Sequence, residues 1–289
     1  MTQLNNTIKL LRFPFSFFLM PLFILALSQA ESINYTHAIV AFIIIHLLVY
    51  PSSNGYNSYV DKDETPIGGL GKPPQPTRQL FYITVAMDVL ALLLSYLFIS
   101  ACFMWCILAY ILASRAYSAK QIRLKKYPLL GMLTVVVFQG GFTFYMCTLG
   151  ISNAPFEFTF AHMVLLCACS FQIAGAYPLT QIYQHEADLK DGVTTLSYNL
   201  GYKGTFVFTA CMFALCNVFY YLYFDAMDSL NQFYVVQLFF VPIVLFFARW
   251  CYQVFADATN ANFKNTMRMN LIGAVCMNLC FVTLYFLNK

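Results

Sequence analysis

The sequence has 289 residues, of which 60% are hydrophobic and only 10% are charged. Soluble domains usually carry about 25% charged residues, so this composition excludes an ordinary soluble protein and predicts an integral membrane protein. The formal net charge of +4 is too small and too scattered to indicate binding of nucleic acid. The ten cysteines lie mostly in apolar runs without a CxxC pair, which argues against a zinc site or a disulfide framework.

The first apolar segment, residues 13–31, allows two interpretations. It follows Lys9 and Arg12 and ends in the small-residue sequence SQA, a pattern that also resembles a secretory signal with its cleavage site. We favour a retained membrane span, because the loop charges described below are then distributed consistently.

Nine segments of the chain have the length and composition of a membrane-spanning helix, which needs about 20 mostly apolar residues. We therefore predict an all-α fold in which nine transmembrane helices form a bundle around a central cavity. The whole chain, residues 1–289, is expected to be a single domain, since the longest stretch between spans is the Gly- and Pro-rich segment 52–78. The nine predicted spans are 13–31, 36–51, 79–99, 101–117, 128–150, 158–182, 205–224, 232–254 and 269–287.

The charges of the loops between these spans alternate. The outer loops, near 32–35, 151–157 and 225–231, contain no Lys or Arg, whereas nearly all basic residues fall in the other set. This asymmetry follows the positive-inside rule and predicts that the N-terminus is inside, the C-terminus outside and the inner loops cytoplasmic.

Two acidic segments lie on the predicted inner face. The first, NGYNSYVDKDETPIGG at 54–69, continues from the second span, and the second, YQHEADLKDGVTTLS at 183–197, continues from the sixth. Asn57 and Asp61 are four residues apart, as are Gln184 and Asp188, so each pair lies on one helical face. Glu64 and Asp191 would extend these faces by about a turn, whereas Asp63 and Glu186 would join them only if the backbone bends or ends.

A third inner segment, SRAYSAKQIRLKKYP at 114–128, supplies cations. Carboxylates favour Mg²⁺, which usually bridges protein acids to substrate phosphates, and Lys and Arg bind phosphate oxygens. The inner face thus offers acids for a metal and cations for phosphate, above an apolar interior. This combination indicates a ligand with a charged head and an apolar tail, such as a prenyl diphosphate. The basic residues of this segment are Arg115, Lys120, Arg123, Lys125 and Lys126.

These segments resemble the UbiA superfamily of intramembrane prenyltransferases along nearly the whole chain. Members have nine transmembrane helices and two cytoplasmic Asp-rich motifs, usually N-D-x-x-D-x-x-x-D and roughly D-x-x-x-D, the second often followed by G-x-x-T. The segment YSAKQIRLKKYPLLG is also similar to the family's Tyr-Ser and Arg-Leu-Lys region. Ser58, Thr65 and Gln184 depart from the family motifs, which leaves the number of metal ions open.

The resemblance implies a magnesium-dependent enzyme that transfers a prenyl group from a prenyl diphosphate to an aromatic or quinone-precursor acceptor. It implies catalytic roles for Asp61 and Asp188. The metal ligands implied are Asn57, Asp61, Asp63, Glu64, Gln184, Glu186 and Asp188. The substrate-binding residues we expect are Asn57, Tyr117, Arg123, Lys125, Lys126 and Lys264. Lys264 is included because the last inner loop, around 260–265, could border the site.

Other functions remain open from the sequence. A terpene cyclase of the same superfamily would ionise the same diphosphate without an acceptor, and a transporter or an inactive relative would not turn it over. Asp88, an acid inside the third span, is either a functional base or a partner in an interhelical hydrogen bond. The segment IGGLGKPP at 67–74 is expected to be a flexible cover that orders over the opening when substrate binds. The acceptor, the prenyl chain length and the oligomeric state are not specified by the sequence.

Overall fold

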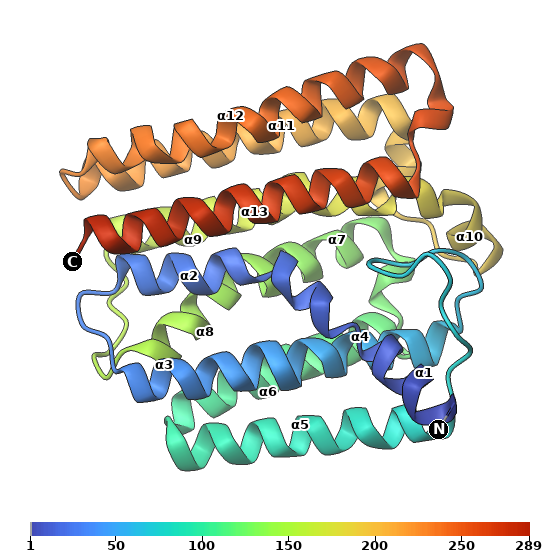
Figure 1. Cartoon of the computed structure of the whole chain (residues 1–289), viewed down its shortest axis with the longest axis horizontal. Coiled ribbons are helices and arrows are strands. Elements are labelled where there is room, and N and C mark those ends of the chain that lie inside the picture. The colour runs from blue at the N-terminus through green and yellow to red at the C-terminus, as the bar shows by residue number, and fades with distance from the viewer. Residues whose placement is uncertain (1) are drawn as a thin grey trace.

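The computed structural model describes residues 2–289, and these fold into a bundle of long antiparallel helices (Figure 1). The first half of the bundle contains α1 Thr2–Leu11, η1 Phe13–Phe18, α2 Met20–Gln29, α3 Tyr35–Phe42, η2 Ile43–Val49, α4 Tyr50–Asp61, α5 Arg78–Phe98, α6 Ala101–Ser118 and η3 Leu124–Lys126. The second half contains α7 Pro128–Val136, η4 Val137–Gly141, α8 Phe142–Ile151, α9 Phe160–Gln181, η5 Ile182–Gln184, α10 His185–Lys190, α11 Leu196–Ala226, α12 Leu230–Ala256, η6 Ala258–Asn260 and α13 Phe263–Leu287.

Eight of the nine predicted spans are confirmed as long apolar helices, and the first corresponds to a bent pair of helices. Within residues 2–289, eight helical segments are long and apolar enough to cross a membrane. A ninth span is a broken pair, Gln3–Phe18 and Met20–Gln29, bent by 41°. Proline explains the break, because Pro14 and Pro21 stand at the starts of η1 and α2 and cannot donate a backbone hydrogen bond. The predicted span 13–31 therefore begins with a short 3₁₀ segment.

The second span is longer than the sequence pattern indicated. α3, η2 and α4 join into one helix over Tyr35–Asp61, so polar residues after position 51 remain helical. At Gly55 this helix packs closely on α5, because a Cβ there would lie 2.9 Å from Thr84 Cγ2. The first acidic segment is consequently carried on a rigid helix end that projects beyond the apolar span.

The inner loops predicted from charge lie at one end of the bundle, and the outer loops lie at the other (Figure 1). At the outer end, the amide of Asn34 donates to the carbonyl of Ile151 at 2.9 Å, and Tyr223 donates to Gln29 at 3.0 Å. At the inner end, Gln184 reaches the carbonyl of Pro66 at 3.3 Å. At the inner end, segments distant in sequence thus converge, and the candidate site lies there.

Candidate active site

The first acidic motif is held at the C-terminal end of α4. Asn57 donates from its amide nitrogen to Asp61 Oδ2 at 2.8 Å and to Ser118 Oγ at 3.1 Å, which confirms that Asn57 and Asp61 share one helical face. Both amide hydrogens are used in this way, so the amide oxygen is the atom available to a cation. The helix ends because Lys62 adopts a left-handed conformation with φ of 55°, and the chain then turns back toward the bundle.

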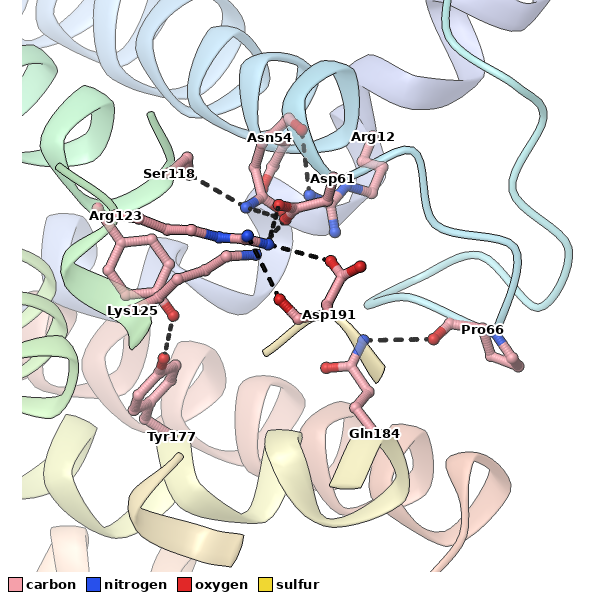
Figure 2. Close-up of polar contacts among 12 residues, drawn as sticks. Arg12, Asn54, Asp61, Pro66, Ser118, Arg123, Lys125, Tyr177, Gln184 and Asp191 are labelled. Atoms are coloured by element: carbon pink, nitrogen blue, oxygen red, sulfur yellow. Dashed lines mark hydrogen bonds and ion pairs between the residues drawn. The ribbon is translucent and has the colours of Figure 1, made fainter. Parts of the chain in front are cut away.

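Two cations from the loop after α6 contact this motif. Lys125 Nζ lies 2.5 Å from Asp61 Oδ2, and Arg123 lies 3.7 Å from Asp61 Oδ1 (Figure 2). Arg123 also binds Asp191 Oδ2 at 3.0 Å, so a single guanidinium links the two acidic segments. The turn is fixed from below by Gly131 of α7, where a Cβ would lie 3.0 Å from the Cα of Lys125.

The second motif is positioned by the short helix α10. His185 stacks on Tyr202 with ring centroids 5.0 Å apart, and its Nε2 lies 2.8 Å from Ser197 Oγ. These contacts anchor α10 to the start of α11, so that Asp188, one turn further along, lines the same cavity as Asp61. The two predicted catalytic acids are therefore at the same end of the bundle and in the same cavity.

This cavity has a volume of about 350 Å³ and changes in character with depth. Its mouth is lined by the acids and by Lys125, and Tyr117 and Tyr177 join their hydroxyl groups in its wall. Apolar side chains line it further in, on helices α9, α11, α12 and α13. These include Phe213, Phe240, Ile243, Ala274 and Met277. A charged mouth above an apolar interior is the arrangement expected for an amphiphilic ligand.

The acids at the mouth are suited to a divalent cation. Asp61 has a side chain only 4% exposed, and its Oδ1 has no hydrogen-bond partner. Burial, followed by the negative charge of Asp61, raises the pKa of Asp63 to about 6. A hard cation with oxygen ligands would satisfy the unpartnered oxygen and offset this crowding of negative charge. Among residues 2–289, however, no three His, Cys, Asp or Glu side chains already stand together as a metal site.

The family comparison agrees with this geometry. The model of the UbiA prenyltransferase family matches residues 17–272, which is most of the chain. The chain belongs to this family. A comparison with curated proteins gave no match.

Several solved structures share the UbiA fold of this chain at low sequence identity. A UbiA homolog from Archaeoglobus fulgidus bound to GPP and Mg²⁺ is 18% identical with a TM-score of 0.71, covering 97% of this chain and 99% of that one. The apo UbiA homolog from Aeropyrum pernix K1 is 15% identical with a TM-score of 0.69, over 94% and 98% of the two chains. A digeranylgeranylglyceryl phosphate synthase structure is 16% identical with a TM-score of 0.62, over 99% and 98%.

The structure brings most of the sequence-predicted site residues of this UbiA-family chain to the cavity. The lining set includes Asn57, Asp61, Asp63, Tyr117, Lys125, Gln184 and Asp188. Asp63 reaches the cavity because α4 ends at Asp61 and the chain turns at Lys62, which is the bend that its position on an ideal helix required.

Five predicted residues do not line the cavity. Arg123 pairs with an acid of each motif but is not itself a lining residue. Glu64 and Glu186 are exposed and line neither of the two pockets described here, since α4 has ended before Glu64 and Glu186 faces outward from α10. Lys126 is exposed beside the inward-facing Lys125. Lys264 lies in a separate pocket between α12 and α13. The predicted segments meet at the cavity, but the sequence patterns did not resolve the direction of each side chain.

Asp88 is paired with Arg115, and neither residue lines the cavity. Arg115 Nε donates to Asp88 Oδ2 at 3.1 Å, and Ser52 donates to Asp88 Oδ1 at 2.6 Å. The guanidinium also stacks over the ring of Tyr56 at 4.0 Å. The interhelical role of Asp88 is therefore the one that the contacts favour, with an arginine as its partner, and Arg115 is removed from the group of phosphate-facing cations.

Arg12 also lines the cavity, although the sequence pattern indicated only a basic residue on the inner side. It is 9% exposed and adopts φ of 49° at the break before η1. Its guanidinium donates to the carbonyl of Asn54 at 3.2 Å (Figure 2) and to the carbonyl of Gly68 at 3.2 Å. The hydrogen bonds from Arg12 to Gly68 and from Gln184 to Pro66 hold the 62–77 loop against the mouth of the cavity. A basic residue just before a proline-broken span was the signal available in the sequence.

Proposed function

We propose that this UbiA-family protein catalyses the Mg²⁺-dependent transfer of a prenyl group from a prenyl diphosphate to an aromatic or quinone-precursor acceptor within the membrane. The observation that carries the proposal is the position of Asp61, Asp188 and Lys125 at the mouth of one apolar cavity. Structures of similar fold solved with GPP and Mg²⁺, and with DMAPP and Mg²⁺, support the choice of substrate class and cofactor.

The oxygen atoms at the mouth are the groups that would hold Mg²⁺. Asp61 and Asp63 would contribute from the first motif and Asp188 from the second, with Asn57 offering its amide oxygen. Magnesium usually has few protein ligands, and water and substrate phosphate complete its coordination shell. This agrees with acids that lie in one cavity without forming a closed metal cluster among residues 2–289. When bound, the ion neutralises negative charge on the diphosphate and makes it a better leaving group.

The chain's own cations would act on the same leaving group. Lys125 lines the mouth from η3, and Arg123, the residue before η3, lies 3.7 Å from Asp61 Oδ1. The donors of both side chains match phosphate oxygens. As the bond between the allylic carbon and the diphosphate oxygen lengthens, negative charge grows on that oxygen, and fixed cations stabilise it. The positive allylic fragment would face the tyrosine rings of the cavity wall, each worth about 0.5–2 kcal/mol. The apolar depth of the cavity keeps water away from this fragment.

An assay of purified protein in lipid nanodiscs tests the proposal. Labelled prenyl diphosphates of several lengths are supplied with Mg²⁺, with and without aromatic acceptors such as hydroxybenzoates and naphthoquinols. Prenylated acceptor formed only in the presence of Mg²⁺ is expected. Free cyclic terpene formed without acceptor would identify a cyclase, and binding of diphosphate without any turnover would identify an inactive relative.

The side of the membrane on which the site opens is also part of the proposal. The excess of Lys and Arg at the end of the bundle that carries both acidic motifs supports a cytoplasmic opening. We expect protease to cleave the protein within the 62–77 loop in sealed inside-out vesicles and to leave this loop intact in right-side-out vesicles.

A further inference from the structure

A second pocket lies at the same end of the bundle as the active site but between α12 and α13. Its cationic lining residues are Arg249 from α12 and Lys264 and Arg268 from α13. Gln253, Asn260 and Asn265 supply amide groups around them. The pocket shares no lining residue with the central cavity, so its cations serve something other than the diphosphate proposed there.

The charge in this pocket is not compensated by the protein. Within residues 2–289, the Lys and Arg ion pairs with acids are made by Arg115, Arg123 and Lys125, and none of the three pocket cations makes one. The acid nearest in sequence, Asp257, is occupied by Thr259 and does not line the pocket. Lys264 and Arg268 are four residues apart on one helix, where like charges repel. Such a group favours an anion.

The pocket has a preformed frame. The buried indole of Trp250 donates to the carbonyl oxygen of Asn260 at 2.8 Å, and the Asn265 side chain donates to the same oxygen at 3.0 Å. Asn260 in turn donates to the carbonyl of Asp257 at 3.1 Å. The loop that joins α12 to α13 is thereby fixed across the end of both helices, so an anion would bind without a large ordering cost.

Apolar stripes on both helices lead to the pocket. On α13 the series that starts at Lys264 and Arg268 continues at helical spacing through exposed Leu271, Val275, Leu279, Val282 and Phe286. On α12 the series of exposed Tyr234, Leu238, Val241 and Leu245 ends at Arg249. Each helix therefore presents a lipid-facing apolar surface that ends in cationic residues. A phospholipid matches this order when its acyl chains lie along the helices and its anionic headgroup lies at the cationic end.

From this arrangement we propose that the pocket lined by Arg249, Lys264 and Arg268 binds the headgroup phosphate of an anionic phospholipid. The three cations and surrounding amides contact the phosphate, and the acyl chains lie along the α12 and α13 stripes. Such a lipid would stabilise the contact between α12 and α13, two helices that also line the central cavity.

The test measures lipid binding by the full-length protein in detergent, using isothermal titration calorimetry with dioctanoyl phosphatidylglycerol. Dioctanoyl phosphatidylcholine tests the need for net negative charge, and inorganic phosphate tests the need for acyl chains. The variant is the triple substitution Arg249→Gln, Lys264→Gln and Arg268→Gln. The matched control, Lys9→Gln, Arg78→Gln and Lys120→Gln, removes three exposed charges that line neither pocket.

We expect phosphatidylglycerol to bind more tightly than the other two probes. The triple variant should lose on the order of 100-fold in affinity, and the control variant should change by no more than about threefold. If the triple variant does not fold, Lys264→Gln alone, at an exposed position, should lose about fivefold. Equal binding by the pocket and control variants would overturn the site. Equal affinity for phosphatidylcholine or for inorganic phosphate would overturn its assignment to an anionic lipid.

Discussion

The ammonium group of Lys125 lies 2.5 Å from Oδ2 of Asp61, and this contact joins the first acidic motif to the basic loop. The protein's own cations thus pair with the acid proposed to hold Mg²⁺. We infer that substrate loading exchanges partners: Asp61 turns to the metal and Lys125 to the diphosphate. The pair holds both side chains in position at the mouth of a mostly apolar cavity.

Lys125 and its neighbour Lys126 provide a matched test of this exchange. Lys125→Gln should raise the KM for prenyl diphosphate by about 10- to 100-fold, since a hydrogen bond to a charged group contributes about 1.5–3 kcal/mol. Lys126→Gln removes the same charge from an exposed position and should change KM less than about twofold. Initial rates over a range of diphosphate concentrations give both values, and equal effects would contradict the inward role of Lys125.

The two acids at the mouth should be required for turnover rather than for folding. Asp61→Asn and Asp188→Asn preserve side-chain volume but remove the charge, and each should lower kcat by at least about 100-fold. The control is Asp225→Asn, which changes an exposed acid at the end of α11 that lies away from the site, and this variant should retain activity. Thermal unfolding of each variant in detergent separates lost catalysis from lost structure. Near-normal Mg²⁺-dependent rates in both site variants would remove these acids from the mechanism.

Asp88 should contribute to stability and not to chemistry. Asp88→Ala leaves Arg115 without its acid, which should cost about 3–5 kcal/mol of unfolding free energy and lower the Tm. The double variant Asp88→Leu with Arg115→Met removes both charges and should be more stable than the single variant. The rate per folded molecule should stay close to that of the unmodified protein, and a lost rate with an unchanged Tm would instead assign Asp88 to the reaction.

Gly273 offers a way to measure the length of the prenyl site. It lines the cavity on α13, and a Cβ built there meets no atom within 4 Å. A side chain can therefore begin at this position without a contact at its Cβ, and Gly273→Phe should occupy part of the cavity and shorten the longest prenyl diphosphate that is turned over. Val275→Phe, exposed on the same helix, is the control. An unchanged chain-length profile for Gly273→Phe would show that the prenyl tail lies elsewhere.

Mg²⁺ activation should depend on pH through Asp63. Its pKa is raised to about 6 by burial and by Asp61, so its carboxyl takes up a proton as the pH falls through 6. A protonated carboxyl is a poor ligand, so the Mg²⁺ concentration for half-maximal activity should rise by at least about tenfold per pH unit below 6. Asp63→Asn should weaken activation and flatten this dependence. The exposed Glu64→Gln should keep it, and identical pH profiles for all three proteins would exclude Asp63.

The sequence predicted the number of spans and the pairing of the two acidic motifs because both follow from patterns that extend over many residues. Apolar runs of about 20 residues must span the membrane, and basic loops must share one side. The four-residue spacing of Asn57 and Asp61 likewise predicted a shared helical face, and the two side chains form a hydrogen bond of 2.8 Å there.

The direction in which each side chain points could not be predicted from the sequence in the same way. Nothing in the spacing of Lys125 and Lys126 shows which one faces Asp61, because this depends on the short turn at η3 and on the close approach of Gly131. Arg115 was grouped with the phosphate cations, since its partner Asp88 lies on another helix, 27 residues away in sequence. Helix ends, turns and contacts between distant helices are decided by tertiary packing, which a pattern along one chain does not contain.

The central claim is that a divalent cation lies between the carboxylates of Asp61 and Asp188 together with a diphosphate. A crystal structure with Mn²⁺ and a non-reactive prenyl thiodiphosphate, collected at the manganese absorption edge, tests it directly. We expect an anomalous peak within coordination distance of both acids, with the prenyl tail in the apolar cavity. A peak bound to only one motif, or none at the mouth when the ligand is present, would contradict the account.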